Sequence, residues 1–183
     1  MSAELPGKPG TPEDSPLESF SHCHEGILTH LGALGELPAL AAAATRAREL
    51  AGQTQRFFAE AMLAHHEEEE RELFTAVLAS SVAGEEAARV QAMVQRLTEE
   101  HRAIEVLWYR LAPQLKRLTN GHVEPLDGAL ASELVSRYRA HADFEEREFL
   151  PLCQLILGRN GSHMAALGLA LHMRHAPQKL PYI

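Results

Sequence analysis

Length, composition and charge bound the class of protein. The chain has 183 residues, of which 45% are hydrophobic, and this suffices for one buried core. The formal net charge of -8, with no cluster of Lys or Arg, disfavours phosphate backbones and anionic lipid surfaces. We therefore expect neither nucleic acid nor a membrane as a partner. We find no apolar leader and no stretch near the roughly 20 apolar residues of a membrane span, so the expected location is cytoplasmic.

Read in chain order, the sequence predicts five helices and no strands. A polar tail, residues 1–14, precedes a capping box that begins at Ser15 and starts the first helix. Gly35 and Pro38 are expected to end that helix, and the segments 80–84 and 119–125 supply the next two breaks. The expected helices cover residues 16–34, the segment after Pro38 to about 80, 85–118, 127–157 and 162–174.

Long helices joined by short loops pack antiparallel against their neighbours. The prediction is therefore an all-α fold, an antiparallel up-down-up-down four-helix bundle over residues 15–158. Residues 159–183 are expected to form a short C-terminal helix and tail docked on the bundle. No second domain is indicated.

A histidine interrupts the apolar stripe of each long helix. At about 100° per residue, these four histidines share a helix face with Leu, Ile, Val, Phe and Met side chains. A buried imidazole without a partner costs on the order of 1 to 3 kcal/mol. Glu69 and Glu145 each follow one of the histidines by four residues, so each pair points the same way. A dication would satisfy the whole set: His24, His65, Glu69, His101, His141 and Glu145.

The two halves of the chain repeat this arrangement. The segment from His24 to Ile27 corresponds to that from His101 to Ile104, and 65–74 corresponds to 141–150. The lone histidine and the His-x-x-x-Glu pair lie 41 residues apart in the first half and 40 in the second. The spacing and the helix faces exclude three neighbours, interpreted as solvent-facing or supporting residues: His22, His30 and His66.

Four histidines and two carboxylates exceed the needs of one tetrahedral zinc ion. They suit two ions that share bridging carboxylates. Imidazole with carboxylate favours iron, manganese or zinc, and the ligand set does not choose among them. We take iron as the preferred metal, with zinc or manganese as alternatives. The two cysteines form no Cys-x-x-Cys pair, so a thiolate site is not indicated.

The segments H-H-E-E-E-E-R-E-L-F, from His65, and H-A-D-F-E-E-R-E-F-L-P, from His141, form a doubled signature. This signature resembles that of hemerythrin-like HHE cation-binding domains, over roughly residues 20–157. The resemblance implies an antiparallel four-helix bundle that holds an oxo- or hydroxo-bridged, non-haem di-iron centre. By matching position, it implies terminal ligands at His24, His65, His101 and His141, with Glu69 and Glu145 bridging the metals.

Two positions depart from the family pattern. Glu105 stands where oxygen-carrying hemerythrins have a second histidine, four residues after His101. The substitution argues against reversible oxygen carriage, and it makes Glu105 an additional candidate ligand or leaves a coordination position open. The second carboxylate follows its histidine by four residues rather than five, so Glu146 is the alternative to Glu145. The pattern is closer to the iron-centre repair proteins of this superfamily.

The sequence leaves alternatives open for the role of the histidines and for the function. The histidines could be core residues that carboxylates or backbone carbonyls satisfy without a metal. His172 and His175 share a face of the last expected helix and are interpreted as surface residues. The leading function is a module that binds or senses oxygen, nitric oxide or iron, with a small diatomic molecule as its partner and homo-oligomers left open. The alternative is a di-iron enzyme that consumes peroxide or nitric oxide, or that repairs iron-sulfur centres by donating iron.

Overall fold

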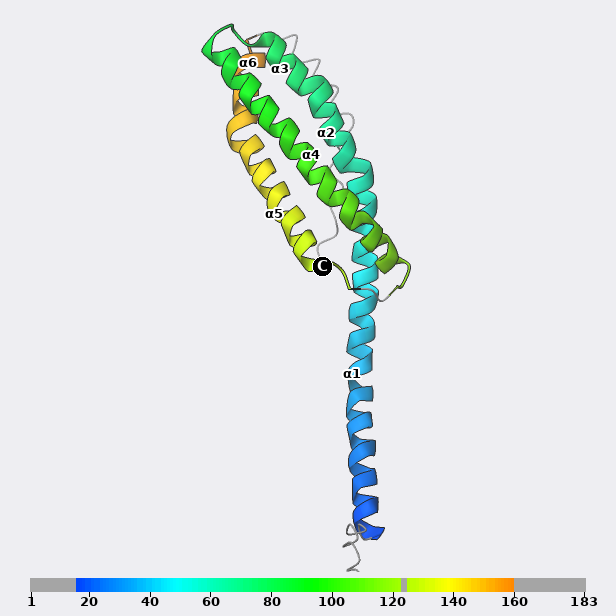
Figure 1. The fold of residues 1–183 in the computed structure, drawn as a ribbon. Helices are drawn as coiled ribbons and strands as arrows, with labels where there is room; N and C mark the ends of the chain where they lie inside the picture. The colour runs from blue at the N-terminus through cyan, green and yellow to red at the C-terminus, as the bar shows by residue number, and fades with distance from the viewer. Residues whose placement is uncertain (1–15, 123–124, 160–183) are drawn as a thin grey trace, which may run out of the picture. The chain divides into compact units, whose positions relative to one another are not determined.

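The computed structural model describes residues 16–122 and 125–159, and the described residues form helices without any strand (Figure 1). The expected all-α class is therefore confirmed. The helical elements are α1 (Pro16–Phe57), η1 (Phe58–Met62), α2 (Leu63–Glu68), η2 (Glu69–Phe74), α3 (Thr75–Ser80), α4 (Glu85–Thr119), α5 (Gly128–Phe144), η3 (Glu145–Phe149) and α6 (Leu150–Leu157). The three elements labelled η are π-helical turns, whose hydrogen bonds span five residues. The expected C-terminal helix and tail lie outside the described residues.

The predicted break at Gly35 and Pro38 is wrong, because α1 continues through both residues. A proline inside a helix removes one backbone hydrogen bond and costs about 3 kcal/mol. The segment that follows Pro38 is rich in Ala, the strongest helix former, and includes the run Ala41–Ala44. We attribute the unbroken helix to this high local propensity, which the prediction weighed too lightly against one proline.

The chain divides into two compact units, Met1–Arg46 and Ala47–Ile183. The described part of the first unit belongs to α1, and every side chain from His24 to Arg46 is exposed. Its exposed large apolar residues are Ile27, Leu28, Leu31, Leu34, Leu37 and Leu40. Thr29 and Thr45 donate their hydroxyl hydrogens to the backbone carbonyls of Glu25 and Ala41, one turn earlier.

One helical run, His24–Ser80, is long and apolar enough by length and composition to cross a membrane, with a mean hydropathy of 1.4 in its most apolar window. The statement that no stretch approaches a membrane span is therefore wrong by this measure. The sequence analysis divided the run at Pro38, whereas α1 joins its apolar segments. Core helices and signal sequences pass the same test, so this finding alone assigns no location.

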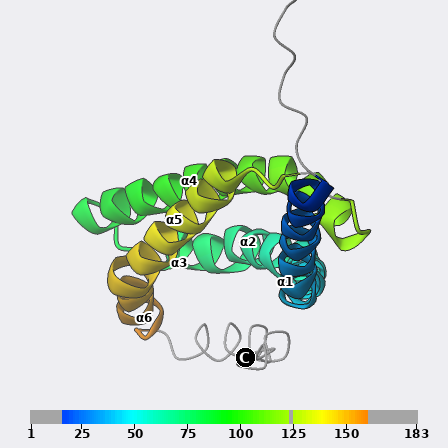
Figure 2. The ribbon, with the colours of Figure 1, turned by 90° about the horizontal axis from the view of Figure 1, so that it is seen from below.

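The second unit positions the site by packing three successive helical runs. Within the unit, α4 runs antiparallel to α2–α3, and α5–α6 runs antiparallel to α4 (Figure 1). From below, α5 begins beside α4, and α6 reaches α3 (Figure 2). The expected helix at 85–118 is found at Glu85–Thr119, and that at 127–157 at Gly128–Leu157. Asp127 caps α5 by accepting a hydrogen bond from the Leu130 amide at 2.9 Å.

Two apolar clusters fill the core of the second unit, and they leave a polar layer between them in each helical run. One cluster consists of Leu73, Phe74, Val77, Val90, Met93, Leu97, Phe149, Cys153, Ile156 and Leu157. The other consists of Ala51, Met62, Ile104, Leu107, Trp108, Leu111, Leu115, Leu130 and Leu134. In each run the residues between the clusters include buried His or Glu side chains. The fold thus brings polar groups from three runs into one layer shielded on both sides.

Candidate metal centre

Five buried polar residues from three helical runs form this layer, and we call them the histidine–glutamate cluster. Its members are His66, Glu69, His101, His141 and Glu145. Their exposed fractions lie between 0% and 6%. Glu69 and Glu145 each open a π-helical turn, η2 and η3. Such turns are rare and occur often at functional sites. The two buried glutamates therefore coincide with an uncommon backbone conformation.

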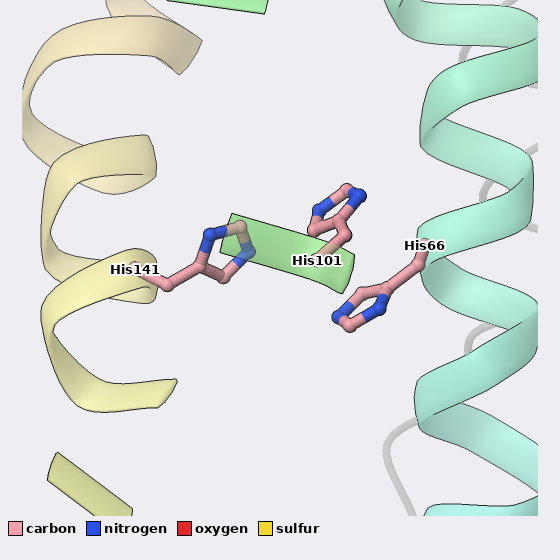
Figure 3. Close-up of side chains that lie close together, drawn as sticks. All are labelled: His66, His101 and His141. Atoms are coloured by element: carbon pink, nitrogen blue, oxygen red, sulfur yellow. The ribbon is translucent and has the colours of Figure 1, made fainter. Parts of the chain in front are cut away.

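The three imidazole rings of the cluster face one another from α2, α4 and α5 (Figure 3). The rings of His66 and His101 stack with their centroids 4.0 Å apart and their planes 5° from parallel. The ring of His141 meets that of His101 edge-on, at 4.8 Å and 68°. Three rings this close share one small volume of the core.

Each ring is held from behind by a carboxylate. The Nδ1 atom of His66 lies 3.1 Å from Glu105 Oε1, that of His101 lies 2.8 Å from Glu70 Oε1, and that of His141 lies 3.1 Å from Glu100 Oε2. An ionised carboxylate only accepts hydrogen bonds, so Nδ1 must donate in each pair. In the neutral ring, Nε2 then carries a free lone pair. Imidazoles that bind metals have this arrangement.

The atoms that face the middle of the cluster lack hydrogen-bond partners. They are the Nε2 atoms of all three histidines together with Glu69 Oε2 and Glu145 Oε1. His101 Nε2 lies 3.4 Å from Glu69 Oε2, and His141 Nε2 lies 3.5 Å from Glu145 Oε2, without forming a hydrogen bond. Leaving one such atom unsatisfied costs on the order of 1 to 3 kcal/mol. Five of them together indicate a site built for a cation.

The ligand atoms of the cluster fall into two overlapping groups. His66, His101 and His141 form one group, and Glu69, His101, His141 and Glu145 form the other. Within each group, one ligand atom from every residue lies within 4.8 Å of those from the others. The shared pair, His101 and His141, therefore lies at the centre of the arrangement.

The surroundings of the cluster favour the neutral form of two of its imidazoles, those of His66 and His141. Burial, followed by the nearby His101 and His141, lowers the pKa of His66 from 6.5 to about 3. Burial also lowers the pKa of His141. Burial, followed by the charge of Glu69, raises the pKa of the Glu145 carboxyl from 4.5 to about 8. A bound metal cation stabilises the unprotonated form of an imidazole and the ionised form of a carboxyl, so it would release the proton that Glu145 holds.

The comparison with known families decides the class of this chain. Residues 15–153 match the hemerythrin HHE cation binding domain. The chain belongs to the hemerythrin HHE family. No curated protein and no solved structure matches it. The family implies a helical bundle that binds a cation, in agreement with the signature at 65–74 and 141–151. The antiparallel order of four helices stays a prediction.

The structure of this HHE domain brings together four of the six predicted ligands: Glu69, His101, His141 and Glu145. His24 lies in the first unit with an exposed side chain, and its role as a ligand stays a prediction. Glu146, the alternative to Glu145, is exposed. His172 and His175 lie outside the described residues.

His66, which the sequence analysis set aside in favour of His65, lies in the cluster, and the role of His65 as a ligand stays a prediction. The His66 side chain is 1% exposed and belongs to the cluster, so the prediction that it faces away is wrong. The His65 side chain is 36% exposed, with its Nε2 3.4 Å from Glu69 Oε1. On a helical wheel, His66 follows Met62 by four residues and precedes Glu69 by three, so it was equally in phase. The repeat spacing had favoured His65.

The carboxylates behind the rings were the residues that sequence reasoning missed. The sequence analysis singled out neither Glu70 nor Glu100. Glu105, the additional candidate ligand, accepts a hydrogen bond from His66 Nδ1 and is outside the ligand-atom groups. Each carboxylate lies 31 to 41 residues from its histidine in the chain. No local pattern pairs residues that distant, so a single sequence held no signal for these contacts.

Proposed function

We propose that this HHE domain holds two iron ions in the histidine–glutamate cluster and uses them to bind or sense oxygen, nitric oxide or iron itself. The observation that carries the proposal is the set of five buried, unpartnered donor atoms that face one another. Nitrogen and oxygen donors in this mixture suit iron, manganese or zinc. Iron is favoured here because the doubled signature resembles that of di-iron members of the family.

The donor set supports two ions rather than one. His66, His101 and His141 would bind through Nε2, and the carboxylates of Glu69 and Glu145 would complete the set of donors. Three nitrogens and four oxygens fill about seven of the roughly twelve positions of two six-coordinate ions. The remaining positions are available to water, bridging oxygen, a further side chain or an incoming small ligand. Ferrous ions held there would supply electrons and open coordination positions for a diatomic molecule.

The test is metal content and the visible spectrum of matched variants. We would purify the protein aerobically, quantify iron, zinc and manganese by plasma mass spectrometry, and record oxo-to-iron charge-transfer bands. The wild type and the control His122→Ala, which alters an exposed histidine, should hold two irons per chain. His101→Ala should lose both the metal and the bands. A wild type that takes up no stoichiometric metal, even after anaerobic reconstitution with iron, would contradict the proposal.

One observation favours the alternative, an enzyme that acts on peroxide or nitric oxide or that donates iron for repair. Glu105 stands where oxygen-carrying members have a ligating histidine, and its carboxylate is engaged by His66 Nδ1 and by Arg102. A centre with fewer imidazoles and more open positions suits turnover better than reversible carriage. Steady-state consumption of peroxide or nitric oxide by the iron-loaded protein would favour the enzyme. A stoichiometric spectral change without turnover would favour binding.

A further inference from the structure

Two arginines on the outer face of α4 hold the carboxylates that back the three rings. The Arg102 guanidinium donates to Glu70 Oε2, and it also donates to both oxygens of Glu105, at 3.1 and 3.2 Å. Those two carboxylates accept hydrogen bonds from His101 and His66. Arg102 is therefore linked through one carboxylate each to the two stacked rings of the cluster.

The third ring has a separate link of the same kind. Arg96 donates from Nε to Glu100 Oε1 at 2.7 Å, and Glu100 Oε2 lies 3.1 Å from His141 Nδ1. The Arg96 guanidinium also lies over the Phe144 ring, 3.6 Å from its centre. Arg96 is thus linked through a carboxylate to one histidine, whereas Arg102 is linked to two.

These contacts determine which ring nitrogen of each histidine carries the proton. A neutral imidazole with a carboxylate at Nδ1 keeps its hydrogen there and leaves Nε2 free to bind a metal. The side chains of Glu70, Glu100 and Glu105 are partly exposed, at 17% to 29%. Their orientation therefore depends on the groups that form hydrogen bonds with them. A guanidinium is always charged and has several donors in one plane, so it can hold two carboxylates at once.

We propose that Arg102 and Arg96 are positioning residues that fix the tautomer and orientation of the three cluster histidines through Glu70, Glu105 and Glu100. Arg102 sets His66 and His101, and Arg96 sets His141. The inference rests on the proposed metal-binding function for its effect on affinity. Its effect on the rings themselves is independent of any metal.

The test compares Arg102→Gln and Arg96→Gln with the control Arg137→Gln. Arg137 is 54% exposed, close to the 56% of Arg102 and the 51% of Arg96, and it pairs with Glu133 one turn away. In chelator-treated, nitrogen-15-labelled protein at pH 7.5, NMR correlations across two bonds report the tautomer of each ring. Arg102→Gln should shift His66 and His101 toward a mixture of tautomers and leave His141 unchanged. Arg96→Gln should do the reverse, and the control should change none.

The second readout is the affinity for ferrous iron, measured anaerobically against a chromophoric chelator. Losing a group that orients a metal ligand typically costs about 10- to 100-fold in affinity. We expect a loss in that range for Arg102→Gln, a smaller loss for Arg96→Gln and for the charge-conserving Arg102→Lys, and none for the control. Melting temperatures of the chelator-treated variants should match that of the wild type, since exposed ion pairs contribute little to stability.

The outcomes separate the two claims. If wild type binds iron but both variants match Arg137→Gln in tautomers and affinity, the positioning role is overturned and the metal site stands. A shift of tautomers without a change in affinity also overturns the role in metal binding. If wild type binds no iron while the tautomers shift ring by ring as expected, the positioning of the rings is supported and the proposed function fails.

Discussion

Replacing Glu145 with glutamine tests the electrostatics of the cluster. In the folded chain the pKa of Glu145 is raised from 4.5 to about 8, by burial and then by the charge of Glu69. At neutral pH the folded state therefore keeps a proton that the unfolded chain has lost. The stabilisation from this proton is complete below pH 4.5 and is lost as the pH rises through 8. Chelator-treated protein should become less stable over that rise.

The size of the effect follows from the pKa. Between pH 7 and pH 9 the folded-state carboxyl goes from mostly protonated to mostly ionised, while the unfolded carboxyl stays ionised. The free energy of unfolding should then fall by about 1 kcal/mol because of Glu145. The lowered pKa values of His66 and His141 act with the opposite sign, because their stabilisation is lost as the pH falls below 6.5. The two histidines therefore have the larger effect on the pH dependence of the unfolding free energy below pH 6.5. Above pH 7 Glu145 has the larger effect.

The assay is urea unfolding followed by circular dichroism at several pH values, on chelator-treated protein. Comparing wild type with Glu145→Gln cancels the titration of groups that the two proteins share. The difference between their unfolding free energies should change by about 1 kcal/mol from pH 7 to pH 9. Glu148→Gln, which alters an exposed carboxylate of the same π-helical turn, should keep the wild-type dependence. Equal pH dependence in wild type and Glu145→Gln would contradict the raised pKa of Glu145 in the folded chain.

Three further comparisons test the ligand assignment and the core. His66→Ala should lower iron binding per chain by plasma mass spectrometry much more than His65→Ala, and the reverse result would restore the sequence-based choice. His24→Ala should also reduce bound iron, whereas the exposed control His30→Ala should not; equal iron in both would remove His24 from the ligand set. Leu97→Ala should cost about 2 to 5 kcal/mol in urea unfolding, because the side chain is fully buried, and a cost below 1 kcal/mol would contradict its place in the core.

The sequence predicted the features that depend on local periodicity. Helix ends near Glu85, Thr119 and Leu157 follow from caps and turn residues, and the structure has them within about a residue. His101 and Glu145 were identified because they lie on the apolar face of their helices, where a polar side chain needs a bonding partner. These signals lie within one or two turns of a helix.

The remaining features depend on competing or distant interactions. Pro38 lies inside α1 because local helix propensity outweighed one lost hydrogen bond. The choice between His65 and His66 is decided by how α2 packs against α4 and α5, since both fit the same helical wheel. The carboxylates behind the rings come from other helices and become visible only in three dimensions.

The histidine–glutamate cluster is proposed to bind two metal ions. The most direct measurement is a crystal structure of the iron-loaded protein with diffraction data on both sides of the iron absorption edge. The account predicts two anomalous peaks, each about 2 Å from Nε2 of a cluster histidine, with Glu69 and Glu145 between them. An iron-loaded crystal whose cluster shows no peak, or whose irons lie only on the surface, would contradict it.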